Sequence, residues 1–372
     1  MTRTSPLHRL YDEQGQSPWI DNLRRGFLTS GHLDDLIRRG ARGLTSNPTI
    51  FQKAIQGSSE YDDQFRELAV AGHDVGQIYW ELVLRDIHGA LDAFDPLHAE
   101  SGGRDGFVSV EVDPSLAFDG EGTLAAARAL HDRIGRANVM IKIPATPEGI
   151  PAIRQMIAEG RNVNVTLIFS LQRYGEVIEA YIAGLEDRAR DPRADLSRVN
   201  SVASFFISRV DSAVDARLSA IGGDAERNLA GKAAIAQGRL AYELFTASFS
   251  GARWEALAKR GAVVQRPLWA STSTKNPAYN DTLYVDELIG PNTVNTLPDA
   301  TFDAYENHGR VARTIDSDST EAHSVWSQLA AAGVDMAAIA AKLEVDGVSS
   351  FQQSFVELLD ALTEKLATVS RS

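Results

Sequence analysis

The sequence of 372 residues predicts a single (β/α)8 barrel of the α/β class, with additional helices at both ends. Strand-like and helix-like stretches alternate along the chain, which is typical of parallel βαβ units. Eight candidate strands are separated by helices, and eight is the number that closes such a barrel. The rival is an open, doubly wound sheet, but no Gly-x-Gly-x-x-Gly motif follows any of the strands.

The predicted strands are short apolar stretches bounded by turn residues, at 18–22, 43–47, 107–112, 139–144, 162–169, 200–206, 262–270 and 293–297. The predicted helices lie between most of them, at 33–39, 60–94 with a break near Gly72, 122–134, 151–159, 171–187, 210–221 and 228–249. Their apolar residues recur at the helical period, which favours one face packed on the sheet.

A barrel of this type takes about 250 residues, so this chain has length to spare. Residues 1–17 are expected to form an N-terminal extension with a helix at 7–14. The segment from about 320 to 372 reads as two amphipathic helices, 321–343 and 351–369, packed on the barrel. We find no internal repeat or linker, so residues 1–372 are expected to be one domain.

Composition excludes several classes of protein. The 44% apolar content can bury a large core, and the absence of cysteine excludes disulfides and thiolate chemistry. A net charge of −13 argues against nucleic acid as a partner. No apolar run approaches 18 residues, and the N-terminus lacks a signal-peptide pattern, so we expect a cytoplasmic protein with no membrane segment. The eight histidines form no His-x-His or His-Glu-x-x-His pattern, which disfavours a metal site.

One cationic side chain, Lys142, lies inside the apolar stretch Val-Met-Ile-Lys-Ile-Pro at residues 139–144. Burial of an ammonium group favours its neutral form, and a neutral amine attacks carbonyls to form a Schiff base. The alternative is a lysine at a strand end whose stem covers apolar surface while its head reaches water. This stretch alone does not decide between the two.

Polar side chains gather on one face of several predicted strands. Ser109 and Glu111 alternate with valines, and Asn164 and Thr166 alternate with Val163, Val165 and Leu167. In a barrel the apolar face would contact the helices and the polar face would line the interior, where sites form at the C-terminal ends of the strands. Antiparallel strands with one wet face would alternate in the same way. Asn47 before Pro48 could equally be an ordinary turn.

Taken together, these stretches resemble the transaldolase family, in particular its actinobacterial type. Gly-Leu-Thr-Ser-Asn-Pro-Thr-Ile-Phe at 43–51 looks like the N-terminal signature of that family. Ile-Lys-Ile-Pro-Ala-Thr-Pro-Glu-Gly-Ile at 141–150 looks like the signature around its Schiff-base lysine. Residues 108–114 and 164–170 match two further family strands, and the order and spacing fit from about residue 19 to residue 274.

The resemblance implies a (β/α)8 barrel with the reactive lysine on its fourth strand, the strand that carries Lys142 by our count. It also implies an enzyme of the pentose phosphate pathway that needs no metal or organic cofactor. Such an enzyme transfers a dihydroxyacetone unit from sedoheptulose 7-phosphate or fructose 6-phosphate to an aldose phosphate. Its only expected partners are sugar phosphates, and it would be a monomer or a homodimer.

The resemblance assigns four catalytic residues. Lys142 would form the imine, and Asp21 would be the acid and base at the C4 hydroxyl of the sugar. Glu111 and Thr166 would hold a catalytic water and shuttle protons while the imine forms.

The resemblance also assigns residues that contact the substrate. Asn47 and Asn164 would donate hydrogen bonds to the sugar, with Thr45 and Ser109 nearby. Arg209 would hold the phosphate, with the further residues Ser204, Phe206, Ser271 and Lys275. Arg209 could instead form an ion pair with Asp211. The family often has an arginine where this chain has Ser273, and Lys275 could replace it.

Three other functions remain open from the sequence. The first is a fructose 6-phosphate aldolase that releases free dihydroxyacetone; that branch tends to carry a tyrosine where this chain has Phe206. The second is a metal-dependent hydrolase or aldolase on a barrel. The third is a non-catalytic binder of sugar phosphates, which would not need Lys142, Asp21 and Glu111 together.

Overall fold

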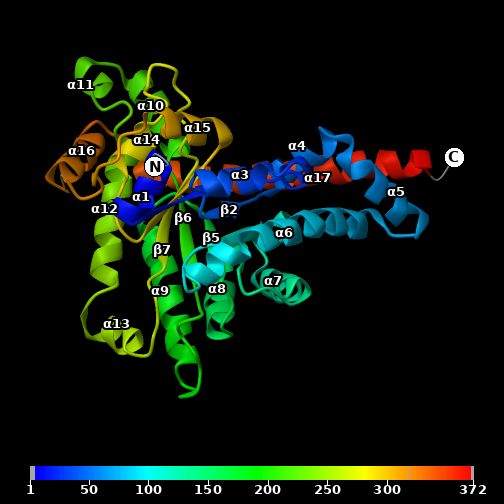
Figure 1. The fold of residues 1–372 in the computed structure, drawn as a ribbon. Helices are drawn as coiled ribbons and strands as arrows, with labels where there is room; N and C mark the ends of the chain where they lie inside the picture. Colours follow the sequence, from blue (N-terminus) through cyan, green and yellow to red (C-terminus); the bar gives the residue numbers. More distant parts are fainter. Residues whose placement is uncertain (1–4, 318, 370–372) are drawn as a thin grey trace.

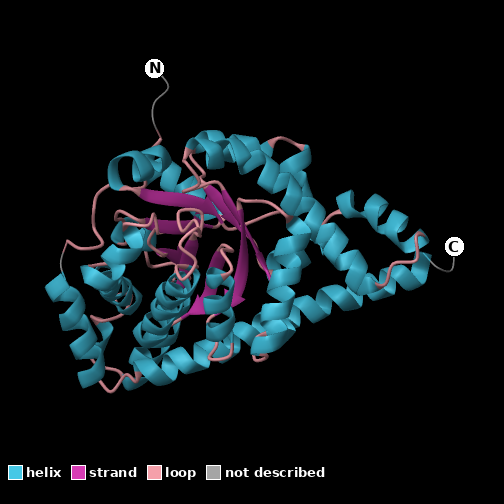
Figure 2. Cartoon of the chain, turned by 90° about the horizontal axis from the view of Figure 1, so that it is seen from below, coloured by secondary structure: helices cyan, strands magenta, loops and turns pink. Residues whose placement is uncertain are grey.

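In a computed structural model, which describes residues 5–317 and 319–369, eight parallel strands close into a barrel (Figures 1 and 2). Each strand pairs with the next in chain order, and the last pairs with the first. The predicted fold class is confirmed. The strands are β1 (Gln16–Ile20), β2 (Gly43–Thr45), β3 (Phe107–Glu111), β4 (Val139–Pro144), β5 (Val163–Ile168), β6 (Ser201–Phe206), β7 (Arg266–Ala270) and β8 (Thr293–Leu297).

Helices surround the barrel, as Figure 2 shows, and fill most of the connections between strands. The N-terminal half contains α1 (Pro6–Gln14), α2 (Arg25–Thr29), α3 (His32–Arg39), α4 (Pro48–Gln56), η1 (Ser59–Tyr61), α5 (Asp62–Val70), α6 (Val75–Glu100), η2 (Pro114–Leu116), α7 (Gly120–Ile134), α8 (Gly149–Ala158) and α9 (Leu171–Arg188). The C-terminal half contains α10 (Ser208–Ile221), α11 (Asp224–Arg227), α12 (Ala233–Ser248), α13 (Gly251–Ala258), α14 (Leu283–Glu287), α15 (Asp299–His308), α16 (Ser319–Ala331) and α17 (Met336–Val369). No helix among the described residues is long and apolar enough to cross a membrane.

All eight predicted strands are present, and the bounds of β4 and β8 are as predicted. The seventh strand is shorter than predicted, because its backbone pairing with β6 begins only at Arg266, and the residues before it make other hydrogen bonds. The Val263 carbonyl accepts from the Tyr181 hydroxyl at 2.7 Å, and the Gln265 amide donates to Ser201 Oγ at 2.9 Å. Short helices such as α2, α4 and α13 were not predicted, since a helix of one or two turns carries little periodic signal.

The predicted position of the break between the two C-terminal helices was wrong. The helices are separated at Gly333, which has φ of +77°, and the side chain of Asp335 then accepts a hydrogen bond from the Ala338 amide at 2.9 Å. From Met336 the helix α17 runs without interruption to Val369. Gly347 lies inside this helix, where its missing side chain lets the helix approach β5: an added Cβ would stand 3.0 Å from Leu167 Cδ2.

The polar face of the strands points into the barrel, as predicted. Asn164 of β5 donates a hydrogen bond to Ser109 of β3 at 3.0 Å, although β4 lies between these strands. Only side chains that point inward can meet across an intervening strand. The parallel register also sets Glu111 of β3, Lys142 of β4 and Asn164 of β5 side by side, so these three form one level of the interior.

A charged cluster fills the end of the barrel where the strands begin. Asp105 is fully buried and receives Arg42 Nε at 2.8 Å, Arg266 Nη2 at 3.2 Å and Ser17 Oγ at 2.8 Å. Two guanidinium groups and a hydroxyl compensate the buried carboxylate, which would otherwise be costly. This end is therefore packed, and the interior opens toward the C-terminal ends of the strands.

Helix α17 crosses the open end of the barrel. It contacts α10 and β5 on one side and α4, α6 and η2 on the other. Figure 1 shows its C-terminal part beside α4, in an arm of helices that extends away from the barrel together with α5 and α6. The C-terminal helix therefore lies on the face where barrel sites form.

Gly43→Ala is expected to lower the free energy of unfolding by about 1–3 kcal/mol, because a Cβ at this position would stand 2.5 Å from the buried Trp19 ring. Urea denaturation followed by circular dichroism would measure the change. Gly175→Ala, in α9, is the matched control, since the nearest atom to its Cβ would be 4.0 Å away. Equal stability of the two variants would contradict the packing argument.

Candidate active site

A cavity of about 90 Å³ lies inside the open end of the barrel, at the C-terminal ends of the strands. Lys142 is among the residues that line it. The full set comprises Asp21, Thr45, Asn47, Lys142, Thr166, Ser204, Phe206, Arg209, Ala270, Ser271, Thr296 and Phe351. Nine of the thirteen predicted site residues belong to this set; Glu111, Ser109, Asn164 and Lys275 do not.

The amine of Lys142 is buried, with only 5% of the residue exposed. Nζ donates to the Ser46 carbonyl at 2.9 Å and lies 3.1 Å from Glu111 Oε2. Ser46 is itself fixed, because its hydroxyl donates to the Ser109 carbonyl at 2.7 Å. The lysine therefore does not extend to bulk water, and the alternative of a solvated strand-end lysine is wrong.

Glu111 lies behind Lys142 and is 7% exposed. Burial raises the pKa of its carboxyl, while the charge of Lys142 opposes the rise. Thr166 Oγ1 lies on the cavity wall, is buried, and has no hydrogen-bond partner among the described residues. A buried hydroxyl of this kind is expected to bond to a water or a ligand.

Asp21 follows the end of β1 and faces the same cavity. Its Oδ1 accepts from Thr45 Oγ1 at 2.8 Å, and Thr45 Oγ1 lies 2.7 Å from Thr296 Oγ1. Because the Thr45 proton points to the carboxylate, Thr296 must donate to Thr45. Burial raises the pKa of Asp21, and the charge of Lys142 opposes the rise. The carboxyl is thus held in place by a chain of two threonines, while burial is what raises its pKa.

Three buried residues form a chain of hydrogen bonds below the cavity. Ser204 Oγ donates to Asn164 Oδ1 at 2.7 Å, and Asn164 Nδ2 donates to Ser109 Oγ at 3.0 Å. Ser109 and Asn164 are fully buried, and of the three only Ser204 lines the cavity. The amide is thereby locked in one orientation, with its nitrogen toward β3.

Asn47 has a second structural role. Its side-chain oxygen accepts from the Ile50 amide at 3.0 Å and so caps the N-terminus of α4. The cap fixes the side chain and uses only its oxygen, so the amide nitrogen remains available as a donor. The Asn-Pro pair is thus both the helix start that its sequence suggests and part of the cavity wall.

Arg209, at the start of α10, supplies a cation to the wall of the cavity. It makes no ion pair or hydrogen bond among the described residues, and its guanidinium carbon lies 5.3 Å from the centroid of the Phe206 ring. The alternative of an ion pair with Asp211 is wrong, since Asp211 accepts from the Ala234 amide at 2.8 Å instead. Burial lowers the pKa of Arg209, yet a guanidinium remains charged at neutral pH.

Ser271 lies next to Arg209 in the site. It has φ of +56°, rare for a residue with a side chain, and its Oγ lies 2.9 Å from Ser208 Oγ. Lys275 is exposed and lies outside the cavity wall, where its Nζ donates to Ser273 Oγ at 2.6 Å. Partial burial and the nearby Arg209 lower the pKa of Lys275.

Sequence reasoning missed Thr296 and Phe351, which both line the cavity. Thr296 could have been found, because it is a polar residue near the end of the eighth predicted strand. Phe351 had no such signal, since an aromatic residue on an amphipathic helix is usually core. Its ring centroid lies 5.9 Å from Lys142 Nζ.

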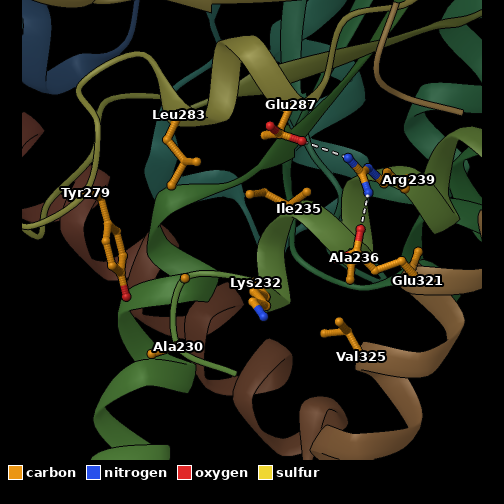
Figure 3. Close-up of a pocket in the computed structure, with 12 residues that line it drawn as sticks. Ala230, Lys232, Ile235, Ala236, Arg239, Tyr279, Leu283, Glu287, Glu321 and Val325 are labelled. Carbon is orange, nitrogen blue, oxygen red and sulfur yellow. Dashed lines mark hydrogen bonds and ion pairs between the residues drawn. The ribbon is translucent and has the colours of Figure 1, made fainter. Parts of the chain in front are cut away.

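A larger cavity of about 480 Å³ lies outside the barrel, between α12, α14 and α16 (Figure 3). Arg239 binds Glu287 at 2.7 Å and Glu321 at 3.1 Å on its wall. None of the predicted site residues lines this cavity. Its size therefore does not make it the better candidate, because the groups capable of chemistry lie inside the barrel.

The mouth of the barrel brings together a buried amine, two carboxyl groups whose pKa is raised by burial, and a guanidinium that makes no ion pair among the described residues. These groups define a lysine-dependent enzyme that acts on an anionic carbonyl compound. The family model described as "Transaldolase/Fructose-6-phosphate aldolase" matches residues 18–362. The chain belongs to this family.

Proteins named transaldolase match nearly the whole chain. The protein from Parafrankia sp. is 51% identical over 358 residues, which are 96% of this chain and 97% of that protein. The protein from Acidothermus cellulolyticus is 50% identical over 370 residues, 99% of each chain. The Frankia alni protein is 48% identical over 365 residues, 98% of each. The predicted family and the predicted enzyme class, transaldolase, are confirmed.

Arg209→Gln is expected to raise the KM for a phosphorylated ketose by about 10- to 100-fold, the effect of losing a hydrogen bond to a charged group. Steady-state kinetics would measure it. Arg217→Gln, an exposed arginine on the same helix, should change little. A similar loss in both variants, or in neither, would argue against Arg209 as the phosphate ligand.

Proposed function

We propose that this enzyme transfers a dihydroxyacetone unit from fructose 6-phosphate or sedoheptulose 7-phosphate to glyceraldehyde 3-phosphate or erythrose 4-phosphate, as a step of the pentose phosphate pathway. The observation that carries the proposal is the buried amine of Lys142, 3.1 Å from Glu111 and open to a cavity that also holds Asp21 and Arg209. A non-catalytic binder would need the guanidinium but not the amine or the carboxyl groups.

Imine formation starts the proposed reaction. The Lys142 amine attacks the ketose carbonyl, and the resulting carbinolamine loses water to give an iminium ion. Glu111 is placed to take and return protons in these steps, and burial raises the pKa of its carboxyl, which makes it a stronger base than a solvated glutamate. Thr166 Oγ1, which is free to bond, is proposed to hold the water that is released and later consumed.

Cleavage of the C3–C4 bond requires loss of the proton from the C4 hydroxyl. Asp21 is proposed to take this proton, since its carboxyl lines the cavity together with Lys142 and its pKa is raised by burial. The iminium group accepts the electron pair of the broken bond and becomes an enamine. The same carboxyl then returns its proton to the new hydroxyl when an aldose phosphate accepts the enamine.

Substrate binding completes the proposal. Arg209, with Ser271 beside it, is proposed to bind the phosphate, because a guanidinium binds phosphate oxygens in two parallel hydrogen bonds. Asn47, Thr45, Ser204 and Phe206 would contact the sugar from the wall, whereas Ser109 and Asn164 would act from below by fixing that wall. Lys275 is proposed to meet the phosphate only at the rim.

Three further expectations stay with this proposal. Residues 1–372 are taken as one domain, the enzyme as cytoplasmic, and its assembly as a monomer or a homodimer. The substrates are intermediates of sugar-phosphate metabolism, which supports the location. Gel filtration with light scattering would settle the assembly.

Incubation with fructose 6-phosphate followed by borohydride is expected to fix one dihydroxyacetone-derived adduct on Lys142, which peptide mass spectrometry would locate. Lys142→Ala should abolish both adduct and transfer. Lys259→Ala, which changes an exposed lysine at the C-terminal end of α13, should leave both intact. An adduct on another lysine would refute the assignment.

The pH profile of kcat/KM should have an acid limb above pH 3.8, the usual pKa of an aspartate, because burial raises the pKa of Asp21 and its basic form is the active one. Asp21→Asn is expected to lower kcat by about 10²- to 10⁴-fold. A borohydride adduct should still form on Lys142, but it should carry the uncleaved ketose phosphate, because imine formation does not use this carboxyl and C3–C4 cleavage does. Asp34→Asn, an exposed change in α3, is the control. Full activity of Asp21→Asn would overturn its role.

A further inference from the structure

Phe351 closes the catalytic cavity from the side opposite the strands. It belongs to α17, a helix outside the eight βα units, and its side chain is 4% exposed. The ring centroid lies 5.9 Å from Lys142 Nζ, within the range of a cation–π contact. Among the residues that line the cavity, Phe351 is the one that comes from the C-terminal helices.

Contacts on both sides of Phe351 fix α17 over the barrel. Ser354 Oγ lies 2.7 Å from Thr49 Oγ1 at the start of α4, and Gln352 Nε2 donates to the Pro114 carbonyl at 3.1 Å. On the other side, Arg173 Nε lies 3.3 Å from Glu344 Oε2. These contacts join the helix to the segments that follow β2, β3 and β5.

The strand next to Thr166 is shaped to meet this helix. Leu167 has φ of +60°, and the register of β5 against β6 shifts between Val165 and Ile168. Such a bulge redirects a side chain. The Leu167 side chain packs on Gly347, one helical turn before Phe351, where a Cβ would be only 3.0 Å away. The close approach at Gly347 brings the next turn, with Phe351, down onto the cavity.

The enclosed space is small. About 90 Å³ is well below the roughly 300–1,000 Å³ usual for small-molecule sites. A three-carbon dihydroxyacetone unit on Lys142 fits such a space more readily than a complete sugar phosphate does. Phe351 forms part of the wall of this space.

An enamine on Lys142 can react in two ways, and this step rests on the proposed function. It can form a carbon–carbon bond with an aldose phosphate, which is transfer. Alternatively, C3 takes a proton, which regenerates an iminium ion; water then adds to the imine carbon, and the C–N bond breaks. The products are dihydroxyacetone and the free amine, and the water consumed equals the water released when the imine formed.

We propose that Phe351 is a specificity-determining residue that directs this partition. Its ring limits the entry of bulk water to the enamine, so the intermediate persists until an aldose phosphate enters. Transfer and release pass through the same intermediate on Lys142, so the access of water to that intermediate bears on the outcome, beside any effect of Phe206 on β6. The ring that α17 places over the cavity limits this access.

The test is a graded series at Phe351, namely Leu, Val and Ala, with fructose 6-phosphate as donor and erythrose 4-phosphate as acceptor. The measured quantity is free dihydroxyacetone divided by transferred product. This ratio is expected to rise as the side chain shrinks, by at least about tenfold for Phe351→Ala. If Phe351→Ala does not fold, the ratio measured for Phe351→Leu and Phe351→Val still tests whether release increases as the side chain shrinks.

Phe355→Ala is the matched control. Phe355 lies one turn further along α17, is 8% exposed, and packs on the Tyr79 ring with centroids 5.0 Å apart, but it does not line the cavity. It should lose comparable stability and keep the parental ratio. An equal rise of the ratio in Phe355→Ala would mean general loosening of α17 and would overturn the proposal, as would a flat ratio across the Phe351 series.

Borohydride trapping in every variant separates the two levels of inference. No adduct in the parent enzyme would refute the proposed function. An adduct on Lys142 in all variants, with an unchanged ratio, would refute the role of Phe351 alone.

Discussion

The contact between the Lys142 amine and the Glu111 carboxylate, 3.1 Å apart inside a closed barrel, is the constraint on which the rest of the site depends. Two opposite charges removed from water stabilise each other only if their separation is fixed and their remaining donors and acceptors form hydrogen bonds. The register of β3 and β4 sets Glu111 beside Lys142, and the Ser46 carbonyl satisfies the amine from the neighbouring strand end. A shift of one residue in either strand would turn one of the two side chains outward.

The barrel protects this pair at both ends. The Asp105 cluster fills the end where the strands begin, and α17 crosses the other. A site enclosed in this way lowers the local dielectric, which raises the pKa of Asp21 and Glu111 and strengthens each remaining charge interaction. Burial, acid–base behaviour and protection of a covalent intermediate thus have a common origin in the closed architecture.

Much of the fold and of the site could be predicted, because the alternation of apolar and polar residues reveals both the strands and the faces of the strands that point inward. Alternating valines and polar residues in 107–111 and 163–168 identified the inward faces, and these faces contain Glu111, Asn164 and Thr166. The depth of each side chain could not be predicted. Ser109 and Asn164 lie below the cavity and Thr166 on its wall, because depth depends on strand stagger, which periodicity does not encode. Lys275 follows the seventh strand closely in sequence, but it is exposed and does not line the cavity.

The sequence by itself determined the barrel, the inward polar faces and the lysine on the fourth strand, because each rests on short-range periodicity and on local motifs. Only the tertiary structure decided what encloses that lysine. Gly347 lies inside α17 and lets this helix approach Leu167 closely, so that Phe351 reaches the cavity. The physical reason is that the contact joins residues far apart in the chain, and its information lies in the fit between two surfaces.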